Sequence, residues 1–303
     1  MSPTTVLLAG AAGNLGNRIA KALLARGADL RALVRNDASD ADTSRLVALG
    51  AKIAAADVND VGSVAAACDG VACVVSALNG LRTVIVDRQG VLLDAAVKAG
   101  VPRFIPSDYA ADFTKTRPGD NRNFDLRREF MARADAAPIK ITSILNGAFM
   151  DMLGAEMPII QPRIHRVLYW GNADQPLDFT SKDNVAAYVA AAALDPSTPR
   201  ILRIAGDTLS ARAIAEVMTK VTGKRFRTLW AGSLGLLTTM IEVTKRLAPQ
   251  PGAAFPLWQG MQYMRDQFSG RAQLHPLDNG RYPGTAWTSV RELLGGRQGT
   301  SPS

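Results

Sequence analysis

The chain has 303 residues, 47% of them hydrophobic and 20% charged, so it can bury a substantial core and does not have the composition of a disordered protein. Its formal net charge is +8 without a long run of Lys and Arg, and we expect no nucleic-acid partner. The two cysteines and two histidines lack the spacing of a metal site, so we expect no metal. No apolar stretch reaches the roughly 18 residues of a membrane span, so we expect no membrane partner and a cytoplasmic location.

The first predicted elements are a strand at residues 6–9, a glycine-rich turn and a helix at residues 17–25. The turn has the spacing G-x-x-G-x-x-G, and the helix has apolar residues on one face and basic residues on the other. Glycines let the backbone approach a pyrophosphate closely, and the N-terminus of the helix offers free N–H groups to the anion. The sequence therefore predicts a dinucleotide site that includes Gly10, Ala12, Gly13, Asn14, Leu15 and Gly16.

Strands and helices alternate through the rest of the first half of the chain. Further strands are predicted at residues 30–34, 53–56, 71–76, 103–106 and 141–145, and further helices at residues 44–49, 61–67, 84–99 and 125–134. Alternation at this spacing is typical of right-handed βαβ units. We therefore expect an α/β fold with a Rossmann-type, doubly wound parallel sheet.

The regular alternation weakens after residue 149, where prolines and glycines interrupt the chain. Helices are predicted at residues 184–194, 211–221 and 234–247, and a strand at residues 201–205. We expect residues 1–150 to form the Rossmann domain, completed by residues 179–205. Residues 151–178 and 206–303 would form a smaller, mostly helical C-terminal substrate domain.

The ends of the later strands indicate which nucleotide is bound. The second strand ends in Arg35, where folds that prefer NAD usually have an acidic residue, and an arginine can pair with the 2′-phosphate of NADP. NADPH is therefore the preferred cofactor, while the nearby Asp37 keeps NAD open; a solvated surface charge is the alternative role for Arg35. Asp57 could accept a hydrogen bond from adenine or simply form a turn. By their position at the carboxyl edge of the sheet, further cofactor contacts are expected at Val58, Ser76, Ala77, Leu78, Pro106 and Ser107.

The usual catalytic pair of short-chain dehydrogenases is missing. In that pair a tyrosine is followed four residues later by a lysine that lowers the pKa of the phenol. The residues four positions after the five tyrosines of this chain are Phe113, Ala173, Ala192, Gln267 and Ala286. That mechanism is therefore absent.

Several segments together resemble the NmrA-like and isoflavone-reductase-like group of atypical short-chain dehydrogenases. The resemblance extends over roughly residues 5–225, and its most specific element is the segment Phe104–Tyr109. The other matching segments are residues 10–16, 33–35, 99–101, 142–149 and 179–186, together with Gln89.

This resemblance implies an NADPH-binding Rossmann fold and a lysine that acts as general base in the pattern F-x-x-K. Here the pattern reads Phe124-Asp125-Leu126-Arg127. An arginine stays protonated and cannot be the base, but Arg127 could stabilise developing negative charge or hold the cofactor. The alternative for Arg127 is a surface charge beside Arg128.

Three more residues complete the expected site. Tyr109, which follows the fifth predicted strand, could be a proton donor or could only line the pocket as a stacked side chain. By the resemblance, Asn146 and Phe149 would face the nicotinamide, Phe149 as a packing surface. The expected catalytic residues are thus Arg127 and Tyr109.

Two functions remain open from the sequence. The first is an NADPH-dependent oxidoreductase that transfers a hydride to a small conjugated or aromatic substrate, such as a carbonyl compound or a quinone. The second is a non-catalytic regulator that senses NADP(H) and acts through a protein partner. The missing lysine favours the regulator, and the otherwise intact pattern of the site favours the reductase.

Overall fold

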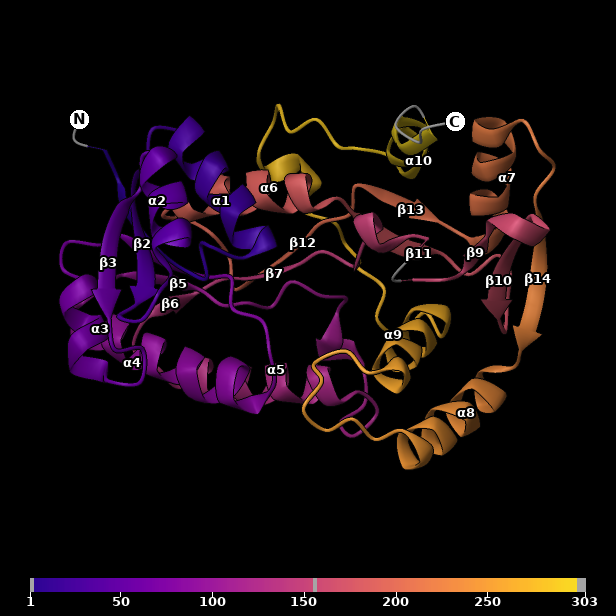
Figure 1. Cartoon of the computed structure of the whole chain (residues 1–303), viewed down its shortest axis with the longest axis horizontal. Helices are drawn as coiled ribbons and strands as arrows, with labels where there is room; N and C mark the ends of the chain where they lie inside the picture. The colour runs from indigo at the N-terminus through magenta and orange to yellow at the C-terminus, as the bar shows by residue number, and fades with distance from the viewer. Residues whose placement is uncertain (1–2, 155–156, 299–303) are drawn as a thin grey trace. The chain divides into compact units, whose positions relative to one another are not determined.

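The computed structural model describes residues 3–154 and 157–298 of the chain (Figure 1). The chain divides into two compact units, each built from separate stretches of sequence. The first unit comprises residues 1–109, 125–144 and 185–202, and the second comprises residues 110–124, 145–184 and 203–303.

The first unit contains a six-stranded parallel sheet with the order β3-β2-β1-β4-β5-β6. Because the order reverses direction between β1 and β4, this is the doubly wound arrangement, and the expected Rossmann-type fold is confirmed. The strands are β1 (Thr5–Ala9), β2 (Asp29–Arg35), β3 (Lys52–Ala56), β4 (Cys73–Ser76), β5 (Arg103–Ile105) and β6 (Lys140–Ile141).

Helices connect these strands and bury their apolar faces against them. The buried cluster includes Leu7, Val74, Leu92, Phe104 and Phe130. A π-helical turn (Thr83–Arg88) leads into α4, so the helix expected at residues 84–99 has two parts. The helices are α1 (Asn14–Ala25), α2 (Asp40–Ala48), α3 (Val61–Ala67), α4 (Gln89–Lys98), α5 (Arg122–Asp135) and α6 (Lys182–Leu194).

The single strand expected at residues 141–145 is divided in the structure. β6 ends at Ile141, and β7 (Ser143–Leu145) pairs with β12 (Ile201–Arg203) outside the six-stranded sheet. The hydroxyl of Thr142 hydrogen-bonds to the Thr198 hydroxyl at 2.7 Å and donates to the Pro199 carbonyl at 2.9 Å. The Thr142 N–H still donates to the Phe104 carbonyl of β5 at 3.0 Å, whereas the Ser143 N–H donates to the Arg200 carbonyl at 2.9 Å, so the backbone changes partner between these two residues.

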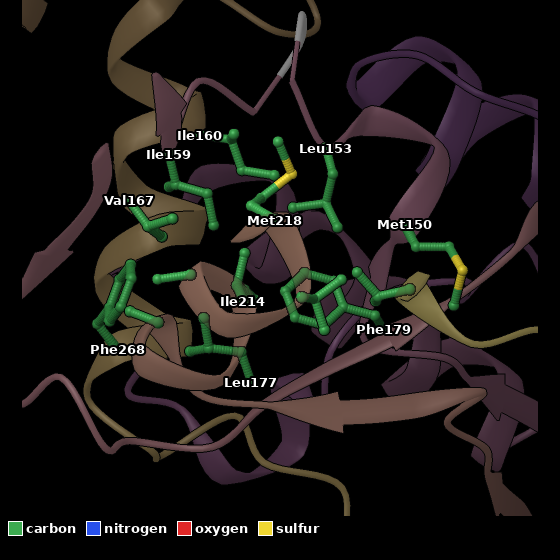
Figure 2. Packing of buried hydrophobic residues seen from close by; sticks show 14 of the residues in the cluster. Met150, Leu153, Ile159, Ile160, Val167, Leu177, Phe179, Ile214, Met218 and Phe268 are labelled. Carbon is green, nitrogen blue, oxygen red and sulfur yellow. The ribbon is translucent and has the colours of Figure 1, made fainter. Parts of the chain in front are cut away.

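The second unit combines helices with two three-stranded sheets, whose strands the sequence did not predict. The sheets have the orders β14-β10-β9 and β13-β11-β8. The strands are β8 (Ala148–Phe149), β9 (Ile160–Gln161), β10 (Arg166–Trp170), β11 (Leu177–Thr180), β13 (Asp207–Leu209) and β14 (Arg227–Gly232), and the helices are α7 (Ala211–Thr222), α8 (Leu234–Leu247), α9 (Leu257–Phe268) and α10 (Val290–Gln298). Figure 2 shows its apolar core, in which Ile159, Leu177, Phe179, Ile214 and Phe268 pack together.

Residues 110–124 make their contacts within the second unit, although they lie before the boundary expected at residue 150. The backbone N–H of Asp112 donates to the Ala272 carbonyl at 3.0 Å, and the Asn121 amide donates to the Asp266 carboxylate at 2.9 Å. These bonds place the stretch in the second unit, which also contains residues 145–150, 179–184 and 203–205. No helix within residues 3–154 and 157–298 is both long and apolar enough to cross a membrane.

Candidate functional site

The glycine-rich turn between β1 and α1 allows no side chain at two of its positions. Gly10 has φ +83°, and a Cβ on it would lie 2.7 Å from the Ala77 carbonyl oxygen. A Cβ on Gly16 would lie 2.7 Å from the carbonyl carbon of Gly10. The residue that precedes α1, Gly13, provides no side-chain cap, so no side chain from that position covers the first N–H groups of the helix. The turn is therefore a cradle that fits a pyrophosphate group.

The loops after β4 and β5 lie beside this turn. The Ser107 hydroxyl donates to the Leu78 carbonyl at 2.6 Å, and the Ser107 N–H donates to the side-chain oxygen of the fully buried Gln89 at 2.9 Å. Since Ala77 also contacts Gly10, the ends of β1, β4 and β5 form one surface at the point where the strand order reverses. Ser76 is fully buried, and Ala77 and Leu78 are half-buried; the contacts of all three with a cofactor stay predictions.

Two arginines flank the turn, and the sequence predicted only one of them. Arg35 is exposed at the end of β2, with its Nε 3.3 Å from the Asp37 carboxylate. Arg45, in α2, donates to the Ala12 carbonyl at 3.0 Å and to the Asp42 carboxylate at 2.8 Å. The sequence contains no local signal for Arg45, because its contact with the turn joins residues 33 positions apart. Together the two charges favour a second anionic group beside the pyrophosphate cradle.

Asp57 forms a turn after β3. Its carboxylate accepts a hydrogen bond from the Asn59 N–H at 2.9 Å, and its own N–H donates to the Ser63 hydroxyl at 3.0 Å. These are the contacts of the turn-forming alternative. Contacts of Asp57 and Val58 with a nucleotide stay predictions.

Arg127 is buried within α5, with 8% of its surface exposed, so the alternative of a helix-surface charge is wrong. Its charge acts on the fully buried Asp108, whose carboxylate accepts a hydrogen bond from the Ser143 hydroxyl at 2.6 Å. Burial raises the pKa of the Asp108 carboxyl, while the Ser143 hydrogen bond and the charges of Arg127 and Arg200 oppose that shift. The guanidinium of Arg127 is therefore part of a buried polar network.

Tyr109 is the next residue after Asp108 and is also buried. Burial raises the pKa of its phenol above the usual value, and the negative charge of Asp108 adds to the shift. Within the described part of the chain, its hydroxyl has no hydrogen-bond partner. A protonated phenol with an unused donor can donate a hydrogen bond to a ligand, and its role as a proton donor stays a prediction.

Asn146 and Phe149 belong to the second unit and are held by its own contacts. The Asn146 N–H donates to the Ala110 carbonyl at 2.9 Å, and the Thr180 hydroxyl donates to the Asn146 carbonyl at 2.7 Å. Phe149 is half-buried, and the Lys182 ammonium lies 6.0 Å from the centre of its ring. Their contacts with a nicotinamide stay predictions.

Comparisons with known proteins find a matching family and relatives that are named as reductases. The NmrA-like family matches residues 2–250. Pinoresinol reductase 2 of Arabidopsis thaliana is 27% identical over 266 residues, which cover 82% of this chain and 83% of the relative. Bifunctional pinoresinol-lariciresinol reductase 3 of Thuja plicata is 27% identical over 253 residues, which cover 77% and 80% of the two chains.

Solved structures show that the fold is shared with such enzymes. A structure titled "AtPrR2 with NADP+ and (+)pinoresinol" superposes with a TM-score of 0.81 at 24% identity, covering 97% of this chain and 99% of the other. An isoflavone reductase structure gives a TM-score of 0.81 at 20% identity, covering 98% and 100%.

Proposed function

The chain belongs to the NmrA-like family, and from this premise we propose that it is an NADPH-dependent reductase of a small aromatic or conjugated substrate. The observation that carries the proposal is the cradle at Gly10 and Gly16, flanked by the charges of Arg35 and Arg45. The names of the relatives support it: they are reductases of pinoresinol, lariciresinol and a phenylcoumaran benzylic ether.

The proposed cofactor site consists of the glycine-rich turn, the first N–H groups of α1, and the side chains of Arg35 and Arg45. The turn and the first N–H groups of α1 bind the pyrophosphate, since a helix N-terminus attracts anions. Arg35 and Arg45 bind the 2′-phosphate, which makes NADPH preferred over NADH. When bound, NADPH supplies a hydride.

Arg127 and Tyr109 have separate roles in the proposed reaction. Arg127 stabilises the negative charge that develops on a substrate oxygen when an adjacent conjugated system accepts the hydride. Tyr109, which burial keeps protonated, donates a hydrogen bond to that oxygen, and solvent supplies the proton that the product gains. No residue has to remove a proton from the substrate, so the reaction does not require the missing lysine.

The proposal is tested by following NADPH oxidation with the full chain and a panel of quinones, enones, aromatic ketones and pinoresinol. We expect turnover of at least one class. Arg127→Ala should lower kcat at least tenfold. The matched control is Arg128→Ala, because Arg128 is its neighbour in α5 and pairs with the Asp125 carboxylate at 3.1 Å. Equal rates for the two variants would contradict the role of Arg127.

A second candidate is a regulator that senses NADP(H) and acts through a protein partner. The observation that favours it is Arg127 at the position where the family's reductases have a lysine. This candidate predicts tight NADPH binding together with no turnover on the whole panel. That result would overturn the reductase proposal.

A further inference from the structure

The segment that joins α8 to α9 (Figure 1) carries an exposed phenylalanine, Phe255, which is 55% exposed. The two residues before it are attached to the start of α5. The Arg122 guanidinium donates hydrogen bonds to the carbonyls of Ala253 and Ala254 at 3.0 Å and 2.8 Å. The Asn123 side chain donates a third hydrogen bond, to the Ala254 carbonyl at 3.0 Å. The backbone before Phe255 is therefore anchored, and its exposed ring has a defined place on the surface.

A series of aromatic rings leads from Phe255 into the interior of the second unit. The centre of the Phe255 ring lies 6.5 Å from that of the Tyr263 ring in α9, with an angle of 34° between the ring planes. Tyr263 is half-buried, and its ring meets the fully buried ring of Phe124 edge-on, with 5.2 Å between the ring centres. Aromatic rings at these separations attract one another in addition to burying area. The series therefore fixes the Tyr263 ring while part of it, and much of Phe255, stays open to solvent.

Gly260 leaves the neighbouring turn of α9 without a side chain. Among the described residues, a Cβ on Gly260 would meet no atom beyond its own stretch of helix within 4 Å. Gly260 is three positions before Tyr263, so both lie on one face of the helix, and helical side chains lean towards the turn that precedes them. Glycine is disfavoured inside a helix, and none of the described residues packs closely enough at this position to require it. The space beside the Tyr263 ring is therefore open to the close approach of a ligand.

Phe255, Gly260 and Tyr263, which we call the α9 aromatic face, favour a flat aromatic group as ligand. The rings of Phe255 and Tyr263 attract another ring through their faces and edges, and the bare turn at Gly260 admits it without a clash. A protein partner fits less well. Two aromatic side chains supply less than about 500 Å² of contact area, whereas a stable protein interface covers about 800 Å² on each partner.

We propose that the α9 aromatic face binds an aromatic ring of the substrate. The inference rests on the proposed reductase function and names the residues of the second unit that select its substrate class. Phe124, on which the Tyr263 ring packs, is three residues before Arg127 in α5. A ligand with an aromatic ring should therefore bind more tightly than a saturated ligand with the same carbon skeleton.

The test is an NMR titration of the full chain, in the presence of NADP+, with 2-naphthol and with its saturated counterpart decahydro-2-naphthol. We expect 2-naphthol to bind at least fivefold more tightly than the saturated compound. Phe255→Ala should weaken 2-naphthol binding at least fivefold, because it removes one of the two rings. Gly260→Leu should weaken it as strongly, because the new side chain fills the open space. Thermal unfolding of Gly260→Leu should not occur at a lower temperature than that of the parent, since leucine is favoured over glycine in a helix.

Two other exposed positions of the second unit provide matched controls. Leu277→Ala removes a different exposed apolar side chain, and Gly235→Leu introduces a leucine in α8 instead of α9. Both should bind 2-naphthol as tightly as the parent does. Absence of 2-naphthol binding by the parent would overturn the inference, and so would equal binding by all variants or equal binding of the two compounds.

The reductase proposal is judged separately, by turnover of the substrate panel. Turnover together with 2-naphthol binding that no variant changes would overturn the α9 aromatic face and leave the reductase proposal standing. No turnover, together with binding that Phe255→Ala and Gly260→Leu both weaken, would overturn the reductase proposal and leave the aromatic binding face standing.

Discussion

Replacement of Gly16 by alanine tests whether the glycine-rich turn is the nucleotide site. The new Cβ would lie 2.7 Å from the carbonyl carbon of Gly10, whereas carbon atoms in good contact are about 3.5–4.0 Å apart. The backbone therefore has to move by about 1 Å, and overpacking of this kind costs about 1–3 kcal/mol. If that shift falls on the N–H groups that bind the pyrophosphate, it weakens NADPH binding about 5-fold to 140-fold.

The assay is a titration of the full chain with NADPH, followed by cofactor fluorescence, together with thermal unfolding of the same samples. The control is Gly260→Ala in α9, where a Cβ meets nothing within 4 Å. It should leave NADPH affinity unchanged and stabilise the fold by about 0.5–1 kcal/mol, since alanine is favoured over glycine in a helix. Unchanged affinity in Gly16→Ala would refute the assignment of the turn.

Three other predictions concern the first unit. Arg35→Ala should weaken NADPH binding at least fivefold and leave NADH binding unchanged. Both affinities are measured by titration, with the exposed Lys21→Ala as control. Equal losses of affinity for the two nucleotides would contradict a contact between Arg35 and the 2′-phosphate. Burial raises the pKa of Cys68 to about 11 and that of Cys73 to about 12, so neither thiol should react with a disulfide reagent at about pH 8 until the chain is unfolded. The raised pKa of Tyr109 contributes stability that is complete below about pH 10 and is lost as the pH rises above it. Above that pH, the free energy of unfolding, measured with urea, should therefore fall less steeply for Tyr109→Phe than for the parent.

The sequence predicted best those parts of the fold that local signals determine. The α3 helix at residues 61–67 and the α8 helix at residues 234–247 begin and end where the pattern indicated. Both follow a residue, Asp60 or Ser233, whose side chain accepts a hydrogen bond from an N–H of the first turn. The glycine-rich turn was predicted for the same reason, because its geometry depends on residues close together in sequence.

Long-range polar contacts explain why other parts were missed. Helix α9 buries the polar side chains of Gln259, Gln262 and Asp266 beside apolar ones, so its buried face is mixed and its apolar pattern is weak. These side chains bond to residues 121–122, more than a hundred positions earlier. The contact of Arg45 with the glycine-rich turn is long-range in the same way. Pairings of this kind become visible only in the folded chain.

Arg127→Lys tests directly what the arginine at the lysine position means for catalysis. A lysine there would be buried, which lowers its pKa, and it would lie near Asp108, whose negative charge raises its pKa. Arginine side chains stay protonated over the accessible pH range, so a residue of this type adds no step to the pH dependence of the parent's kcat. The kcat of Arg127→Lys should therefore show an additional pH-dependent step near the usual lysine pKa of about 10, with activity lost as the ammonium loses its proton. A pH profile with the same shape as the parent's would mean that the charge at this position does not act on the reacting substrate.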